Sequence, residues 1–491
     1  MGKGFFMAVL NLANKPATSE VTEHKCVFDH GHEGSYYGPI WGGNGSPAAQ
    51  YAGVSAIPAF GQPLQYVEAI GIGLCAFEQS YLQVAMGPSA GNYDSFVRFN
   101  IQTNIIPVNV VQSSGNIVCS CSLNSSANIW SGQAAVGIMR LPSPDSVHDF
   151  NSYVQPDNAD WMGKLQDQSK GRFFQRPLFR ASFPASHDSG MSCVTRATPF
   201  GNASNTRTQT LDIGGQLSAG IRYFDLRPAV WDITASIGPN DFYYGHFASN
   251  LGGQGCLGQN LVASLQQVNQ FLAAHPRELV VLKFSHYQDS STKPFPVSLQ
   301  KELVATVQTQ LGSNMYLAGS NTEKTNHQTI QDLLDSGRRA ICVFDSLDAS
   351  LIDPMQGVLL FGDLSGSPNA DSNFDVYDSY ADSDNLVHMI RDQIGKWKEF
   401  CARPQYCSGM FLFSFTLTMG GEWDNILAEF GYKSILELAS YANEYLWNVI
   451  NCIYRGPASD QHPPPNYVYL DDARGDLPVA VAWYLNVQHT D

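Results

Sequence analysis

Two histidines and an arginine lie close together in one stretch of the chain, between Ala185 and Phe247. His187 stands in Ser-His-Asp-Ser-Gly, Arg227 ends Arg-Tyr-Phe-Asp-Leu-Arg, and His246 stands in Tyr-Tyr-Gly-His-Phe. A pair of histidines can serve as general base and general acid, and a guanidinium can stabilise the charge that develops on a phosphoryl group. Together with nearby carboxylates, these residues could cleave a phosphodiester without a metal ion.

A parallel α/β barrel is the fold class that the surrounding sequence predicts. From residue 161 onward, apolar and β-branched runs alternate with stretches that have apolar residues at helical spacing. This alternation is typical of an irregular TIM-like barrel, in which reactive residues lie at the C-terminal ends of the strands. The expected strands are 221–227, one near 242, 279–284, 339–344, 410–415 and 468–470, and the expected helices are 259–274, 297–311, 385–400 and 435–451.

Residues 1–145 differ in pattern from the rest of the chain. They are rich in Gly, Ser and Asn and contain short β-branched segments separated by turn residues, which predicts an all-β, sandwich-like domain. Such a domain could bind a membrane surface or a glycan. The polar residues 146–160 are expected to link it to the barrel, which we place at residues 161–491. The apolar run at residues 1–10 favours a first β-strand over a signal peptide.

Composition excludes several classes of partner. The chain has 491 residues and a formal net charge of −16, which argues against binding to nucleic acid and against general attraction to anionic membranes. No apolar run approaches the roughly 20 residues that span a bilayer. The ten cysteines form no Cys-x-x-Cys motif or Cys/His cluster that would hold zinc. We expect a protein without a cofactor that is secreted or lies peripherally at membranes.

The order of the motifs resembles the X domain of phosphatidylinositol-specific phospholipase C. The resemblance is carried by His-Asp-Ser-Gly, by Asp-Ile-x-x-Gln-Leu-x-x-Gly-Ile-Arg-Tyr-Phe-Asp-x-Arg and by Tyr-Gly-His, and Trp161-Met162 and the sequence that follows His275 fit the same pattern. It covers roughly residues 157–491. It implies a TIM-like barrel that cleaves phosphatidylinositol, or glycosylated anchors built on it, to inositol 1,2-cyclic phosphate and diacylglycerol.

The resemblance also implies roles for the motif residues. His187 would be the general base that deprotonates the inositol 2-hydroxyl, and His246 would be the general acid that protonates the leaving oxygen. Asp188 would orient the arginine and the acid, although a purely local role in its turn stays open. A carboxylate after the last strand would hold His187. Asp471 matches that position, and the adjacent Asp472 is the alternative.

Arg227 distinguishes two types within this family. Calcium-dependent members carry acids at the strand end and a further Glu, whereas this chain has Arg227 beside Asp225 and Ser285 in place of the Glu. A fixed guanidinium can neutralise developing phosphoryl charge and would repel calcium. The resemblance therefore implies the metal-independent, bacterial type. Asp225 would be the partner of Arg227, or the two would form a buried ion pair without a catalytic role.

Substrate binding is expected to involve residues on later strands. Asp378 and Tyr380, in Asp-Ser-Tyr, resemble the aspartate and tyrosine with which bacterial members bind the inositol ring, and Arg338 resembles an inositol-binding arginine, although the neighbouring Arg339 leaves the register ambiguous. Lys283 could reach the phosphate or only place its charge in solvent. His286 ends the same strand, and a function for it stays open.

Two other functions remain possible on the sequence alone. One is a metal-dependent phosphodiesterase similar to sphingomyelinase D, which would need acids where Arg227 stands. The other is a non-catalytic protein that binds a glycan or a membrane. The acidic composition makes the parent inositol lipid a better substrate than its polyphosphorylated forms.

Overall fold

We analysed a computed structural model of the chain. The described part comprises the backbone of strands within residues 5–140 and residues 158–488, the latter without 249–253, 320–323, 367–368, 404–407, 420–433, 454–462 and 476. The predicted linker at residues 146–160 lies outside the described residues except for its last three. Among the described helices, none combines the length and the apolar composition that a membrane-spanning segment needs.

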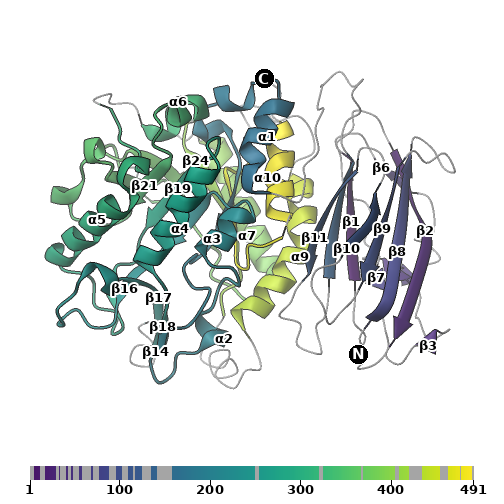
Figure 1. Cartoon of the computed structure of the whole chain (residues 1–491), viewed down its shortest axis with the longest axis horizontal. Coiled ribbons are helices and arrows are strands. Elements are labelled where there is room, and N and C mark those ends of the chain that lie inside the picture. The colour runs from purple at the N-terminus through teal and green to yellow at the C-terminus, as the bar shows by residue number, and fades with distance from the viewer. Residues whose placement is uncertain are drawn as a thin grey trace.

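A closed barrel of eight parallel strands forms the core of residues 158–488 (Figure 1). Each strand is short and almost entirely buried, because its inner face meets the barrel interior and its outer face meets the helices. This confirms the predicted barrel class. The strands in barrel order are β13 (Phe183–Ser186), β15 (Tyr223–Leu226), β19 (Val280–Phe284), β21 (Ala340–Phe344), β22 (Leu359–Asp363), β23 (Phe374–Tyr377), β24 (Met410–Phe415) and β25 (Tyr467–Leu470).

Helices cover the outside of the barrel, and the four expected helices are present with ends shifted by two residues or fewer. Asparagine side chains cap two of them, since Asn260 accepts a hydrogen bond from the Ala263 amide and Asn385 from the His388 amide. The helices are α1 (Trp161–Gln168), α2 (Ala203–Thr206), α3 (Ile213–Ser218), α4 (Leu261–Ala274), α5 (Val297–Leu311), α6 (Ile330–Asp335), α7 (Leu386–Ala402), α9 (Ile435–Ile453) and α10 (Leu477–Gln488).

The barrel is irregular where β22 and β23 occur. The sequence did not predict these two strands, and among the described residues no α-helix lies between β21 and β22 or between β22 and β23. Without a helical stretch between them, the alternation that marks the other strands is lost. The described part of the chain therefore departs from a regular β/α repeat on this side of the barrel.

A second, five-stranded sheet lies beside the barrel and carries His246. Its order is β14 (Arg196–Ala197), β18 (Gln254–Asn260), β17 (Tyr243–Ala248), β16 (Pro228–Val230) and β20 (Gln288–Asp289). Gly190, which ends the His-Asp-Ser-Gly motif, packs directly against this sheet. A Cβ atom at Gly190 would lie 2.1 Å from the ring of Tyr244, so only glycine lets the motif approach β17 this closely.

The described backbone of the N-terminal part consists of strands, as expected. The longer ones form a sheet of order β1-β12-β11 and a second sheet that contains β10-β9-β8-β2-β3. Their packing as a sandwich stays a prediction. The bounds are β1 (Phe5–Asn11), β2 (Ala17–Phe28), β3 (His32–Glu33), β4 (Ile40–Gly42), β5 (Ser46–Pro47), β6 (Ser55–Ile57), β7 (Glu68–Ala69), β8 (Phe77–Gly87), β9 (Ser95–Ile101), β10 (Asn109–Ser113), β11 (Ile117–Leu123) and β12 (Ala134–Arg140).

A buried ion pair holds the N-terminal ends of two barrel strands. Arg222, just before β15, and Glu278, before β19, lie 2.8 Å apart and are both fully buried. The guanidinium also donates to the backbone carbonyl of Ala159. Burial raises the pKa of Glu278 to about 7, in spite of the nearby Arg222. The charge of Glu278 therefore depends on its partner.

Replacing Arg222 with methionine is expected to lower the free energy of unfolding by about 3–5 kcal/mol, because it leaves a carboxylate buried without its counter-charge. Urea unfolding of the full chain measures the change. The solvent-exposed pair Arg277–Asp167, with side chains 45% and 63% exposed, provides the control. Arg277→Met should cost less than about 1 kcal/mol, and an equal loss in the two variants would contradict the expectation.

Candidate active site

The residues that follow the barrel strands form the wall of one cavity of about 460 Å³. Six of the eight strands place their next residue in this wall. Reactive side chains are expected at this mouth of a parallel barrel, where all C-terminal strand ends meet. The six residues are His187, Arg227, Asp345, Asp378, Thr416 and Asp471.

Left-handed residues set the position of several of these side chains. In four of the turns, the second residue after the strand has a positive φ, and in three of these turns the preceding residue, which is His187, Asp345 or Asp471, lines the cavity. Asp and His adopt this conformation more readily than most residues. The four residues are Asp188 (φ 41°), His286 (φ 55°), Ser346 (φ 57°) and Asp472 (φ 48°).

His187 is held on both ring nitrogens. Its Nδ1 lies 2.7 Å from Asp471 Oδ1, and its Nε2 lies 2.8 Å from Nη2 of Arg227. Because a guanidinium only donates, Nε2 must accept, which places the ring proton on Nδ1, facing Asp471. Burial alone lowers the pKa of His187, but the carboxylates of Asp471 and Asp225 outweigh burial and Arg227 and raise it above its usual value.

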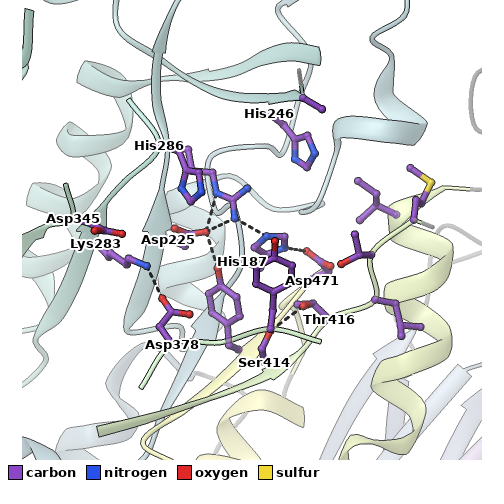
Figure 2. A pocket seen from close by; sticks show the side chains of 18 of the residues that line it. His187, Asp225, His246, Lys283, His286, Asp345, Asp378, Ser414, Thr416 and Asp471 are labelled. Atoms are coloured by element: carbon purple, nitrogen blue, oxygen red, sulfur yellow. Dashed lines mark hydrogen bonds and ion pairs between the residues drawn. The ribbon is translucent and has the colours of Figure 1, made fainter. Parts of the chain in front are cut away.

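The structure distinguishes Asp471 from Asp472. Asp471 continues the strand direction of β25 and points into the cavity (Figure 2). Asp472 has the left-handed backbone and turns away, where it accepts from Thr210 Oγ1 at 2.6 Å and pairs with Arg474 at 2.9 Å. Of the two alternatives that the sequence left open, Asp471 is therefore the partner of His187.

Arg227 connects the two halves of the site. Its Nε and Nη2 lie 3.1 and 3.0 Å from Asp225 Oδ2, and its Nη1 lies 3.6 Å from Asp188 Oδ2. Burial opposes the charge, but Asp225 and Asp188 raise the pKa of Arg227 further above its usual value. The guanidinium thus contacts His187 directly and also lies near Asp188, the carboxylate that holds His246.

Asp225 is a buried carboxylate with several donors. Besides Arg227, it accepts from Tyr469 Oη at 2.6 Å, from the Asp188 amide at 3.1 Å and from Ser285 Oγ at 3.3 Å. Although burial opposes ionisation, Arg227 and Lys283 hold the pKa of Asp225 well below its usual range. Sequence analysis missed Tyr469, but it lies two residues before Asp471 in the predicted last strand and thus on the same face.

His246 faces the cavity from β17, outside the barrel strands (Figure 2). Its Nδ1 lies 2.6 Å from Asp188 Oδ2. Asp188 itself is fully buried, and its other oxygen has no hydrogen-bond partner among the described residues. The carboxylate therefore orients the imidazole with Nε2 free for substrate. This contact is more than the local turn role that the sequence also allowed for Asp188.

A polar group of side chains lies on the other side of His187 (Figure 2). Lys283 donates to Asp378 Oδ2 at 2.5 Å, and its ammonium lies 4.4 Å from the centre of the Phe361 ring. Burial lowers the pKa of Lys283, but Asp378 and other carboxylates outweigh burial and raise it. Tyr380 lines the opening and is 58% exposed. The predicted residues Lys283, Asp378 and Tyr380 are thus brought together.

The predicted role of Arg338 needs correction. Arg338 precedes β21, so it lies at the N-terminal end of the barrel, and its guanidinium donates to the Met315 carbonyl. It does not line the cavity. Neighbouring Arg339 is also outside the cavity and donates to the carbonyl of His275. The C-terminal end of the same strand instead places Asp345 in the wall, where a search for polar residues directly after predicted strands would have found it.

Part of the cavity wall is apolar. These residues come from the end of β17, from the chain after β24 and from the start of α9, and they are Ala248, Leu417, Met419 and Ile435. Within the described ranges, no group of three or more His, Cys, Asp or Glu side chains is arranged to hold a metal ion. The site thus combines a polar wall, an apolar wall and two histidines joined through Arg227.

Comparison with known proteins found related sequences but no matching family model. PI-PLC X domain-containing protein 3 from Danio rerio is 32% identical over 151 residues, which are 26% of this chain and 42% of that protein. PI-PLC X domain-containing protein 2 from Homo sapiens is 30% identical over 173 residues, which are 31% of this chain and 50% of that protein. The chain therefore spans half or less of the length of these two curated relatives.

Solved structures with a similar backbone carry related names. A phosphatidylinositol-specific phospholipase C from S. aureus has a TM-score of 0.44 and 19% identity, covering 68% of this chain and 98% of the other. The corresponding enzyme from Listeria monocytogenes has a TM-score of 0.40 and 14% identity, covering 67% of this chain and 98% of the other. The sequence similarity to these named relatives, over about a quarter to a third of the chain, supports its membership in the phosphatidylinositol-specific phospholipase C X-domain family.

Proposed function

We propose that this protein is a phosphoric diester lyase that cleaves phosphatidylinositol, or an anchor built on it, without a metal cofactor. The observation that carries the proposal is the arrangement around Arg227. One of its nitrogens contacts His187, and another lies near Asp188, which holds His246. A base, an acid and a fixed positive charge thus surround one point, as the transfer of a phosphoryl group requires.

His187 is suited to act as the base. Asp471 holds the proton on Nδ1, so the lone pair on Nε2 is available. A phosphoryl oxygen that binds Arg227 would accept the hydrogen bond that Nη2 of Arg227 now donates to Nε2 of His187. The freed lone pair could then accept the proton of the ring hydroxyl next to the phosphate. That hydroxyl oxygen forms the new bond to phosphorus and closes a five-membered cyclic phosphodiester.

His246 is suited to act as the acid on the bond that breaks. As the phosphorus–oxygen bond to glycerol opens, protonated Nε2 of His246 supplies a proton to the leaving oxygen, which departs as diacylglycerol. Asp188 stabilises the protonated imidazole through Nδ1. The proton that His187 took up balances the one that His246 gave, so the enzyme returns to its starting state by proton exchange with water.

Arg227 supports a metal-independent mechanism because it can supply the positive charge that a calcium ion supplies elsewhere in the family. Its two buried carboxylate neighbours, Asp225 and Asp188, fix the guanidinium at the mouth of the barrel. Ser285, where calcium-dependent members carry a Glu, donates to Asp225 and adds no negative charge. A second cation at this position would be repelled.

The walls of the cavity support an amphiphilic substrate. Lys283, Asp345, Asp363 and Asp378 come from neighbouring strands β19 to β23 and offer donors and acceptors to a polyol. The apolar residues after β24 and at the start of α9 suit the lipid side of the scissile bond. We further propose that the protein acts outside the cell, peripherally at a membrane surface, and that its N-terminal strands form a sandwich that helps it dock there.

Phosphorus NMR of phosphatidylinositol vesicles incubated with the full chain tests the function. In excess chelator we expect the resonance of a five-membered cyclic phosphate to appear and diacylglycerol to be released in equal amount. The same vesicles incubated with His187→Ala provide the control. Choline or phosphorylated choline released from sphingomyelin, or turnover that requires added metal, would instead favour the metal-dependent alternative.

A further inference from the structure

The mechanism leaves one histidine of the cavity unused. His286 lines the cavity, and its side chain stays accessible to solvent there. Figure 2 shows its imidazole above Asp225, on the side of His187 away from Asp471. Its backbone is left-handed, with φ 55°, a conformation that is uncommon outside glycine and that concentrates at functional sites.

A chain of hydrogen bonds determines where the ring of His286 carries its proton. Ser285 Oγ donates to Asp225 Oδ1 at 3.3 Å, and the ionised carboxylate can only accept. The single hydroxyl proton of Ser285 is therefore used. The contact of 2.9 Å between Ser285 Oγ and His286 Nδ1 must then be a bond donated by Nδ1. The opposite nitrogen, Nε2, consequently carries a lone pair.

The charges around His286 keep its ring neutral. Arg227, together with burial, lowers the pKa of His286 to about 4, against the opposing effect of Asp225 and Asp188, and Lys283 adds a further positive charge. Within the described part of the chain, Nε2 has no protein hydrogen-bond partner. A neutral acceptor beside a polar wall suits a hydroxyl group better than a phosphate group, because it can accept the hydroxyl proton but can donate no proton to a phosphate oxygen.

We propose that His286 is a substrate-binding residue whose Nε2 accepts a hydrogen bond from one ring hydroxyl of the polyol headgroup. This inference rests on the proposed function and names a contact within it. Ser285 is the positioning residue, because its hydroxyl fixes the proton on Nδ1. The contact selects for a free hydroxyl at one ring position, since a phosphate there would meet a lone pair in place of a donor.

The variant His286→Asn tests the proposal. Asparagine tolerates the left-handed backbone as histidine does, but its shorter side chain cannot present an acceptor at the place of Nε2. We would measure binding of labelled myo-inositol to the full chain by equilibrium dialysis, and its displacement by each monodeoxy-inositol. We expect inositol to bind about two- to tenfold more weakly to the variant, as the loss of one neutral hydrogen bond implies.

The deoxy series separates a direct contact from a structural effect. One monodeoxy analogue should bind to the wild type two- to tenfold more weakly than inositol does. The same analogue and inositol should bind to His286→Asn with equal affinity. Ser285→Ala, which leaves the imidazole in place, should reduce the difference in affinity between inositol and this analogue. His388→Asn, on the exposed face of α7, is the matched control and should change nothing.

Two results would overturn the proposal, and they are distinguishable. If the wild type binds inositol but every difference between the analogues persists in His286→Asn, the role of His286 is wrong and the proposed function stands. If the wild type binds no inositol, the assignment of the headgroup fails and the role of His286 fails with it. Equal thermal unfolding temperatures of wild type and variant exclude loss of the fold as the cause of weaker binding.

Discussion

Replacing His187 with alanine is expected to lower kcat on phosphatidylinositol by about a hundred- to ten-thousand-fold, the usual contribution of a positioned general base. Asp471 and Arg227 each contact one ring nitrogen of His187, and within the described structure no other histidine is bonded to both. KM should change little, because the imidazole accepts a proton in the transition state and contributes little to substrate binding. Release of water-soluble inositol phosphate from labelled vesicles measures the rate.

The pH profile of the same reaction tests how His187 is held. Because the carboxylates raise its pKa, the acid limb of kcat/KM for the wild type should lie above the ordinary histidine value of about 6.5. Asp471→Asn removes a charge that raises this pKa, so the limb should move to lower pH while the rate falls. Asp472→Asn is the matched control, because its side chain bonds Thr210 and Arg474 outside the cavity. Equal effects of the two variants would contradict the assignment of Asp471.

Replacing Arg227 with glutamine is expected to lower kcat by about a hundred- to a thousand-fold, as the loss of one preorganised electrostatic donor does in other enzymes. The guanidinium is the charge that we assign to the phosphoryl oxygens, and it also supports His187 and Asp188. Added calcium should not restore the rate. Initial rates of the variant, with and without calcium, check both statements.

A matched variant and a chelator control complete this test. Arg196, on the exposed edge strand β14, lies over the ring of Trp231, so Arg196→Gln should keep the wild-type rate. The wild type itself should be equally active in excess chelator. The metal-independent mechanism would be wrong if chelator abolished the wild-type activity and calcium brought it back. Unfolding temperatures are needed beside the rates, because Arg227→Gln removes the guanidinium that neutralises the buried carboxylates of Asp225 and Asp188.

Strand and helix positions were predictable where the pattern of the residues is local. The long apolar run before Phe284 and the helical spacing from 297 to 311 each have one dominant periodicity, and both elements occur as expected. β22 and β23 were not predictable in this way. No described α-helix separates them from each other or from β21, so the local alternation of strand and helix is missing, and their place in the sheet depends on pairing with β21 and β24.

The placement of Arg338 shows a second limit of local patterns. A polar residue beside a predicted strand is equally noticeable at either end, but only the C-terminal end meets the cavity in a parallel barrel. Arg338 precedes its strand, and Asp345 follows it. Once the strand direction is considered, the same segment predicts that Asp345, and not Arg338, lines the cavity.

The candidate reactive groups can be recognised in the sequence, since His187, Arg227 and His246 occur in motifs whose order resembles one family, and alternating local patterns predict the barrel. Which carboxylate contacts which histidine, by contrast, becomes clear from the folded chain. His187 and Asp471 are 284 positions apart, and they meet because β13 pairs with β25 when the barrel closes. The left-handed backbone at Asp472 then turns that aspartate away. Side-chain chemistry is encoded locally, whereas distances of about 3 Å between distant residues depend on closure, register and turn geometry together.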